Sequence, residues 1–215
     1  YISYKTSSEI DGKTIGTYDE FQTFLSNSIP TPNLPPDPKI NFDDLILEKN
    51  NLFVGRENIQ KEFTNYVNKS STNYGVIKAL AGQGKTALMC RLISEYKNIN
   101  HCIYHFCMSQ DSRDRPEVML RSLIAQLCEI FKLNITDWLS ENLKDLKDNL
   151  FPNLLSQIGR GLKNKKILIF IDALDESNRD IEKSIGKVIP RIRIKNIKFI
   201  ISYRVETDNK NIFVE

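Results

Sequence analysis

Nearly continuous apolar runs and helix-like apolar spacing alternate along the chain. Four short runs are almost wholly apolar, as expected for strands buried on both faces of a sheet. Between them apolar residues recur every three or four positions, which is typical of amphipathic helices. The pattern predicts strands over 73–80, 101–108, 165–172 and 197–204, helices over 57–68, 86–96, 116–131 and 181–188, and two shorter helices within 134–162.

Strands that alternate with helices imply βαβ units. We therefore expect an α/β fold with three layers, α/β/α, around a mostly parallel sheet. Asp114 is a candidate N-cap for the helix that begins at Pro116, because proline is tolerated in a first helical turn. The final residues, "NKNIFVE", predict the beginning of a fifth strand.

The prolines divide the chain. Five of the eight lie between Pro30 and Pro38, where they favour extended backbone and exclude a helix or a central strand. This predicts a proline-rich linker over 30–49, the tail of a preceding domain over 1–29, and the main domain over 50–215. Within the tail we expect a turn at Asp11–Gly12, a break near Gly16 and a helix over 18–28. Because the chain begins with Tyr1 rather than Met, we expect it to be a piece of a longer protein.

Composition excludes several classes of protein. Thirty basic and 27 acidic residues leave a net charge of +3, so nucleic acid is not an expected partner. The basic run over 191–198 alternates with isoleucine and predicts a solvated strand face. The four cysteines lack metal-binding spacing. No apolar run approaches the roughly 20 residues of a membrane helix, and the chain shows no secretory signal pattern, so we expect a cytoplasmic protein without a membrane partner.

A phosphate-binding turn is predicted between the first strand and its helix. Residues 79–86 read "ALAGQGKT" and match the P-loop pattern G-x-x-x-x-G-K-[S/T] except that Ala79 replaces the first glycine. Gly82 and Gly84 can adopt the positive φ angles that turn backbone amides toward a phosphate. Lys85 would reach the β and γ phosphates, and the Thr86 hydroxyl would bind Mg²⁺.

Acidic residues end the third strand. "KKILIFIDALDES" brings Asp172 to the carboxyl edge of the sheet and follows it with Asp175 and Glu176. Ligands of open α/β folds bind at this edge. Asp172 would hold Mg²⁺ through water, as a Walker B aspartate does. Either Asp175 or Glu176 would orient or deprotonate the attacking water, and the sequence does not choose between them.

These motifs resemble a known family. In this order, "LAGQGKTAL", "ILIFIDALDE" and "FIISYR" resemble the NACHT class of STAND P-loop NTPases, which are relatives of the AAA+ ATPases. "LFVGRE" resembles the segment that lies near the adenine in these proteins. "HFCMSQDSRD", followed by a helix with "SLIAQL", resembles the branch that includes nephrocystin and the telomerase-associated proteins.

The resemblance implies an ATP- or ADP-binding core that uses Mg²⁺. It implies that the fourth strand separates the Walker B strand from the P-loop strand, and that Arg204 senses the γ phosphate. Ala173 stands where many AAA+ enzymes have a catalytic glutamate, which predicts slow hydrolysis. The expected nucleotide-binding residues are Val54, Gly55, Arg56, Ala81, Gly82, Gln83, Gly84, Lys85, Thr86 and Ala87; the metal ligands are Thr86 and Asp172; the catalytic residues are Asp175, Glu176 and Arg204.

The function that follows is a nucleotide-dependent regulatory switch with weak Mg²⁺-dependent ATPase activity. The family implies partner modules in the same longer protein, a winged helix and C-terminal repeats, and assembly into a homo-oligomer when complete. We expect the chain to end before the lid and winged-helix modules, so that the P-loop strand becomes a sheet edge.

Three other functions remain open. A non-hydrolysing scaffold would use the nucleotide only for stability. A P-loop kinase of small molecules would use Arg113 and Arg115 in a lid, although "DALDE" argues against it. A nucleic-acid motor would use the basic run over 191–198.

Overall fold

The computed structural model describes residues 8–10, 13–15, 38–51, 53–109, 111–177, 184–191, 193–194, 196–205 and 213–214. The chain divides into two compact units, 1–37 and 38–215. In the first, β1 (Ser8–Ile10) pairs antiparallel with β2 (Lys13–Ile15). The turn predicted at Asp11–Gly12, the break near Gly16 and the helix over 18–28 lie outside the described residues.

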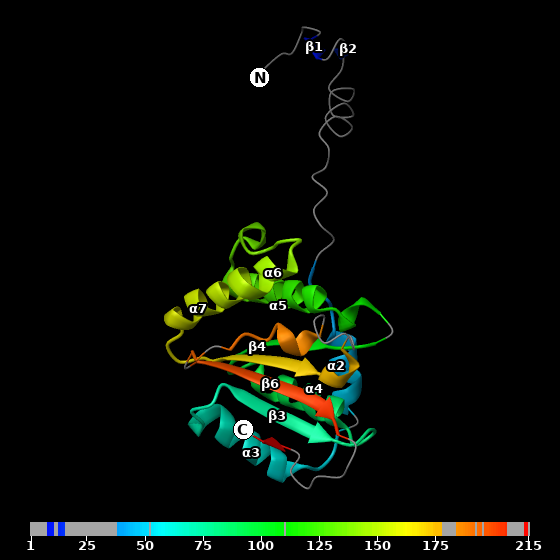
Figure 1. The fold of residues 1–215 in the computed structure, drawn as a ribbon, viewed down its shortest axis with the longest axis vertical. Coiled ribbons are helices and arrows are strands. Elements are labelled where there is room, and N and C mark those ends of the chain that lie inside the picture. The colour runs from blue at the N-terminus through cyan, green and yellow to red at the C-terminus, as the bar shows by residue number, and fades with distance from the viewer. Residues whose placement is uncertain are drawn as a thin grey trace, which may run out of the picture. The chain divides into compact units, whose positions relative to one another are not determined.

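The second unit is built on a five-stranded sheet. Its strands lie in the order β4-β5-β6-β3-β7, and the first four are mutually parallel (Figure 1). The fourth predicted strand therefore does separate the strand of Asp172 from the P-loop strand, as the resemblance implied. The bounds are β3 (Tyr74–Ala79), β4 (His101–Phe106), β5 (Ile167–Asp172), β6 (Ile197–Arg204) and β7 (Phe213–Val214).

The long helices begin and end within one or two residues of their predicted bounds. Their apolar spacing is regular enough to be read without tertiary information. Among the described residues the helices are α2 (Asp43–Asn51), α3 (Glu57–Lys69), α4 (Lys85–Tyr96), α5 (Pro116–Phe131), α6 (Leu143–Asp145) and α7 (Phe151–Gly161), with a π-helical turn over Leu146–Leu150.

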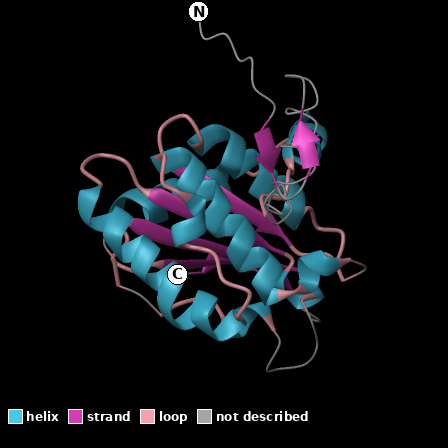
Figure 2. Ribbon diagram, turned by 90° about the horizontal axis from the view of Figure 1, so that it is seen from above, coloured by secondary structure: helices cyan, strands magenta, loops and turns pink. Residues whose placement is uncertain are grey.

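Helices cover both faces of the sheet, which gives the predicted three-layer α/β/α fold (Figure 2). Strand β5, which lies between β4 and β6, is buried along its whole length. Because successive side chains of a strand point to opposite faces, Ile167, Ile169 and Ile171 join the core under α5 and α7. Leu168 and Phe170 join the core under α2, α3 and α4. Burial on both sides explains why this strand is continuously apolar.

The linker predicted over 30–49 is wrong for residues 38–49. These residues belong to the second unit, and α2 packs against α4. Phe42 and Ile46 are buried in the core, with 3% and 6% of their surfaces exposed. Proline excludes helix only near itself, and the last of the five prolines is Pro38, so apolar burial decides the structure beyond it.

Three local predictions are corrected. Asp114 does not cap α5, because it lies in a 3-10 turn over Ser112–Asp114 and leaves Arg115 at the N-cap position. The two helices predicted within 134–162 are a 3-10 turn over Ile135–Asp137 and a continuous helical run from α6 to α7. The described part of the helix predicted over 181–188 is a single 3-10 turn over Ile185–Lys187; residues 178–183 lie outside the described residues.

The sequence predicted that the P-loop strand would be a sheet edge, and this prediction is wrong. Strand β7 pairs antiparallel with β3 through Val76–Val214 and Ile77–Phe213. This short strand therefore shields two positions of β3 from pairing with another chain.

The basic run over 191–198 is not a solvated strand face. Strand β6 begins only at Ile197, and Lys198 is 2% exposed. Its ammonium donates to the backbone carbonyls of Ser70 (2.9 Å) and Thr72 and lies 4.9 Å from the ring centroid of Tyr66. A buried lysine is stable only with such partners, and the sequence pattern does not reveal them.

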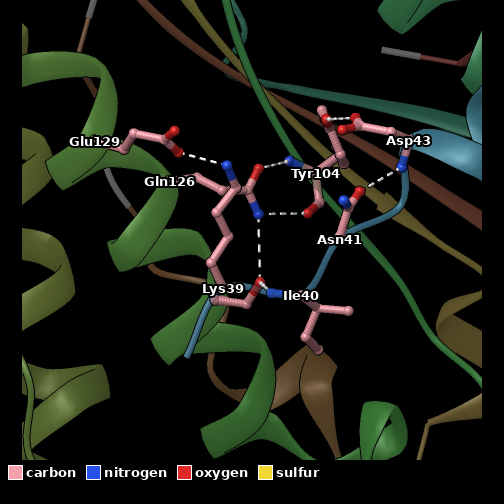
Figure 3. A network of polar contacts seen from close by, with 8 residues as sticks. Lys39, Ile40, Asn41, Asp43, Tyr104, Gln126 and Glu129 are labelled. Carbon is pink, nitrogen blue, oxygen red and sulfur yellow. Dashed lines mark hydrogen bonds and ion pairs between the residues drawn. The ribbon is translucent and has the colours of Figure 1, made fainter. Parts of the chain in front are cut away.

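The other sheet edge, β4, is protected by a side chain. The Gln126 amide of α5 accepts a hydrogen bond from the Tyr104 backbone N–H (3.0 Å) and donates to the Tyr104 carbonyl (2.9 Å). It thereby replaces a neighbouring strand (Figure 3). Ser122 accepts a hydrogen bond from the Ile40 backbone (3.2 Å), and the Tyr104 hydroxyl lies 3.3 Å from Asp43 Oδ1. The network joins the segment before α2 to β4 and α5.

We expect Gln126→Leu to lower the free energy of unfolding by roughly 2–4 kcal/mol, because two backbone groups of Tyr104 lose their partner. Urea unfolding measures the change. Glu129→Gln is the matched control: it breaks only the exposed ion pair with Lys39, which is worth about 1 kcal/mol or less. Equal effects of the two substitutions would contradict a role for Gln126 in closing the edge.

Candidate functional site

A pocket opens at the carboxyl edge of the parallel strands. The pairing of β3 with β6 sets Ala79 beside Arg204, and the pairing of β4 with β5 sets Phe106 beside Asp172. The pocket has a volume of about 320 Å³. Its lining residues come from the P-loop, from the end of β5 and the turn after it, and from α2 and β6: Lys49, Ala81, Gly82, Gly84, Lys85, Thr86, Ala87, Asp172, Ala173, Asp175, Glu176 and Arg204.

The turn between β3 and α4 has the backbone geometry of an anion cradle. Gly82 and Gly84 adopt φ angles of 74° and 72°, which a residue with a side chain adopts only with strain. Gly84 is the N-cap of α4. The amides of Lys85, Thr86 and Ala87 therefore have no acceptor within the helix. Free amides and the positive end of the helix dipole favour an anion here.

The Lys85 side chain folds back over the turn. Its ammonium donates to the carbonyls of Ala79 and Leu80, both at 3.0 Å. Gln83 braces the same turn, since its side-chain oxygen accepts from the Leu80 amide at 3.1 Å. Ala79 is the last residue of β3 and does not have a positive φ. An alanine is therefore tolerated where the P-loop pattern has its first glycine.

The segment before α3 supports the turn from outside. Arg56 has a positive φ of 67° at the N-cap of α3, and its guanidinium donates to the Gln83 carbonyl. Its Nη1 atom is buried and has no hydrogen-bond partner among the described residues. Val54 is 88% exposed, and neither it nor Gly55 lines the pocket. Of these three predicted nucleotide-binding residues, Arg56 is the one with a hydrogen bond to the P-loop in the described structure.

Asp172 is the buried centre of the site, with 2% of its surface exposed. Ser202 donates a hydrogen bond to Asp172 Oδ1, and the Ala173 amide donates to Ser202 Oγ at 2.9 Å. Burial raises the pKa of the Asp172 carboxyl above its ordinary value of 3.8. Hydrogen bonds from Ser202, Thr86 and the Ala173 backbone oppose this rise, as does the positive charge of Lys85. Thr86 and Asp172 both line the pocket.

An arginine ties the two acidic residues after β5 to the end of β6. The backbone amide of Arg204 donates to Asp175 Oδ1 at 2.8 Å, and its Nε lies 3.5 Å from Asp175 Oδ2. Its terminal nitrogen lies 3.7 Å from Glu176 Oε1. Asp175 is held by two contacts and Glu176 by one longer contact. Ala173 begins this turn with a φ of 54°, which turns the chain sharply after Asp172.

The structure brings most of the predicted site residues together and separates a few. Thr86, Asp172, Asp175, Glu176 and Arg204 line one pocket; Gln83 and Arg56 brace it; Val54 and Gly55 stand outside it.

Two residues of the site were missed by sequence reasoning: Lys49, which lines the pocket, and Ser202, which donates to Asp172. Lys49 lies in α2 and forms an ion pair with Glu48 (2.8 Å), and it fell within the predicted linker. Ser202 lies in the motif "FIISYR", where only the arginine was singled out. A small hydroxyl residue two positions before that arginine on a buried strand was the available signal, since such a side chain needs a polar partner.

The donor set fits a nucleotide phosphate and a magnesium ion. Free helix amides and an ammonium are phosphate ligands. One hydroxyl and one carboxylate, Thr86 and Asp172, match Mg²⁺, which binds few protein oxygens and keeps several waters. The cysteines do not compete: all four are free thiols, and the described residues contain no cluster of three His, Cys, Asp or Glu side chains that would hold a metal.

The strand order and the site together make this a P-loop NTPase fold. The family described as "Nephrocystin 3, N-terminal" matches residues 58–204, which is more than half of the 215 residues. The chain belongs to the nephrocystin 3 N-terminal family. The matched range includes the phosphate turn, Asp172 and Arg204, so it confirms the predicted likeness to nephrocystin.

Other comparisons add little to the family assignment. No curated protein matches this chain. One similar solved structure is titled "Crystal structure of Cdc6p from Pyrobaculum aerophilum"; it has 14% sequence identity and a TM-score of 0.41. The alignment covers 76% of this chain and 43% of that chain. In the described residues, no helix combines the length and the hydrophobicity needed to cross a bilayer.

Because Asp172 is buried, we expect its ionised carboxylate to lower the free energy of unfolding of this nephrocystin-family chain. The pKa of Asp172 is raised in the folded state, so the folded protein favours the protonated carboxyl. The stability of the protein with this carboxyl protonated is fully present below pH 3.8 and is lost as the pH rises through the folded pKa. We expect Asp172→Asn, in EDTA and without nucleotide, to unfold at a higher urea concentration than the wild type at pH 8. The difference should shrink as the pH falls toward 4. A less stable variant at pH 8 would mean that the hydrogen bonds and Lys85 outweigh burial.

Proposed function

We propose that this chain is a NACHT-type nucleotide-binding module that uses ATP or ADP with Mg²⁺ as a regulatory switch and hydrolyses ATP slowly. The observation that supports it most directly is that Thr86, from the start of α4, and the buried Asp172 carboxylate, from the end of β5, line the same pocket beside the phosphate turn. Two oxygen ligands from separate elements converge where a metal–phosphate complex belongs in this fold class.

Each binding residue has a distinct task in this proposal. The amides of Lys85, Thr86 and Ala87 bind the phosphates, and the ammonium of Lys85 leaves the carbonyls of Ala79 and Leu80 to bind phosphate oxygen. Lys49 adds a second cation from α2. Magnesium, when bound, neutralises charge on the phosphate oxygens.

We assign the general base to Glu176 and a positioning role to Asp175. Asp175 accepts the Arg204 amide at 2.8 Å and also contacts the guanidinium, so its oxygens are occupied in orienting the arginine. Glu176 has only the 3.7 Å contact to Arg204 and can take a proton from water. Arg204 then lies between the two, with about half of its side chain exposed (52%), and is free to turn toward a terminal phosphate.

Switching requires that two nucleotides bind two arrangements unequally. Moving a population from 1:99 to 99:1 takes about 5.5 kcal/mol of differential affinity. Arg204 is the side chain best placed to supply part of it, because it joins β6 to the acidic turn. In the longer protein we expect a winged helix and C-terminal repeats to respond to this change and a homo-oligomer to transmit it.

We expect Lys85→Ala to weaken the binding of ATP and ADP by roughly 10- to 150-fold, because a charge-assisted hydrogen bond contributes about 1.5–3 kcal/mol. Titration calorimetry with and without Mg²⁺ measures the affinities.

Lys97→Ala is the matched control for this experiment. Lys97 is exposed at the C-cap of the same helix, roughly 18 Å from Lys85 along its axis, so this substitution removes an equal charge and should leave the affinity unchanged. Equal loss in both variants, or no nucleotide binding by the wild type, would refute the proposal.

We expect Glu176→Gln to slow ATP hydrolysis by about 10²- to 10⁴-fold, the usual contribution of a general base, with little change in ATP affinity. Asp175→Asn should slow hydrolysis less, because the Arg204 amide can still donate to the remaining carbonyl oxygen. Single-turnover release of phosphate measures both rates. If the wild type binds ATP but shows no turnover above Glu176→Gln, the protein is the non-hydrolysing scaffold instead.

A further inference from the structure

A second and larger cavity lies at the other end of the parallel strands, where the amino ends of β3, β5 and β6 meet. Its volume is about 900 Å³. It is lined by the end of α3, the loop that leads into β3, and the first residues of β6 with the chain before it: Val67, Asn68, Lys69, Ser70, Ser71, Thr72, Asn73, Tyr74, Lys166, Arg193, Asn196 and Lys198. We call it the amino-edge groove. The nucleotide pocket shares none of these residues.

The amino-edge groove has a single sign of charge. Among the lining residues that the structure describes, four are cationic and none is acidic. Lys69 and Arg193 are exposed, and Lys166 is half-buried. Within the described part of the chain, none of these three side chains forms an ion pair or a hydrogen bond through its cationic nitrogens. A concave surface lined by unneutralised cations concentrates field lines and attracts anions.

The groove is a built feature rather than a loose surface loop. The buried ammonium of Lys198 fastens the loop over 70–72 by donating to two of its carbonyls. Asn73 is 8% exposed, and its amide donates to the carbonyls of Ile194 and Ile197, both at 2.7 Å. Ser70 Oγ accepts from the Thr72 amide at 3.0 Å. These contacts fix the wall that carries the hydroxyls of Ser70, Ser71 and Thr72.

We propose that the amino-edge groove binds a small anion that carries two or more phosphate groups. Two lysines, an arginine and the Ser71 hydroxyl offer single donors at separate points, which suits the oxygens of several phosphates. Recognition of an acidic peptide would favour paired, bidentate arginines. Recognition of single-stranded nucleic acid needs exposed aromatic platforms, and the aromatic lining residue, Tyr74, is stacked on Phe199 with its centroid 5.3 Å away.

The proposed anion site and the nucleotide pocket have no lining residue in common, but strand β6 contributes to both. Strand β6 carries Lys198 near its first residue and Arg204 at its last. Six residues of strand separate them by roughly 20 Å. Tripolyphosphate would also be attracted to the P-loop, so the test must distinguish the two places.

The test is a lysine footprint with tripolyphosphate as the probe. In the Lys85→Ala variant, in EDTA, acetylation of each lysine is followed by mass spectrometry as tripolyphosphate is added at constant ionic strength. We expect Lys69 and Lys166 to be protected, while Lys61 and Lys97, which line neither site, are modified at an unchanged rate. Lys166→Gln with Arg193→Gln should weaken the protection of Lys69 by at least about tenfold. Lys61→Gln with Lys97→Gln is the charge-matched control.

Each other outcome overturns the proposal. Equal protection of all four lysines means general screening rather than a site. Protection that survives the double substitution means that the anion is elsewhere. Stronger protection by a single-stranded oligonucleotide or by polyglutamate, at matched charge, would assign the groove to a macromolecule. Urea unfolding of the double variant, expected to match the wild type because Arg193 is exposed and Lys166 makes no side-chain bond in the described structure, excludes misfolding as the cause.

Discussion

Parallel pairing of β3, β6 and β5 is the constraint on which the rest of the molecule depends. It aligns the carboxyl ends of three strands, so that Ala79 pairs with Arg204 and Asp172 ends the neighbouring strand. Parallel strands need crossovers, and the crossovers are the helices that bury both faces. The phosphate turn, the acidic turn and the arginine are therefore brought together by the same pairing that forms the core.

The buried carboxylate links stability to function. Asp172 lies where a charge is costly, and the hydrogen bond that it accepts from Ser202 and the positive charge of Lys85 only partly relieve that cost. Such a site is stabilised by a bound cation, because the ion supplies the missing charge. The strained turn at Ala173, with its positive φ, is consistent with this view: local strain persists where the surrounding structure holds it.

The side chains at the two ends of the parallel strands differ in charge. The carboxyl edge mixes carboxylates with cations around a small pocket, as a metal–phosphate site requires. The amino edge has cations alone around a larger groove. A net charge of only +3 conceals this asymmetry, since the charges average out along the chain. Strands β3 and β6 run from one site to the other.

The sequence by itself determined the α/β class, the long helices, the four parallel strands and the phosphate turn, because these depend on apolar periodicity and on glycines at fixed spacing. It also brought Asp172, Asp175, Glu176 and Arg204 to one edge, since strand ends can be read locally. Only the tertiary structure decided that 38–49 folds onto the core, that Lys49 lines the pocket and that Ser202 donates a hydrogen bond to Asp172. It alone buried Lys198 and left Val54 outside the pocket lining. These outcomes depend on partners distant in sequence, and no local pattern encodes a hydrogen bond between residues 30 or 128 positions apart.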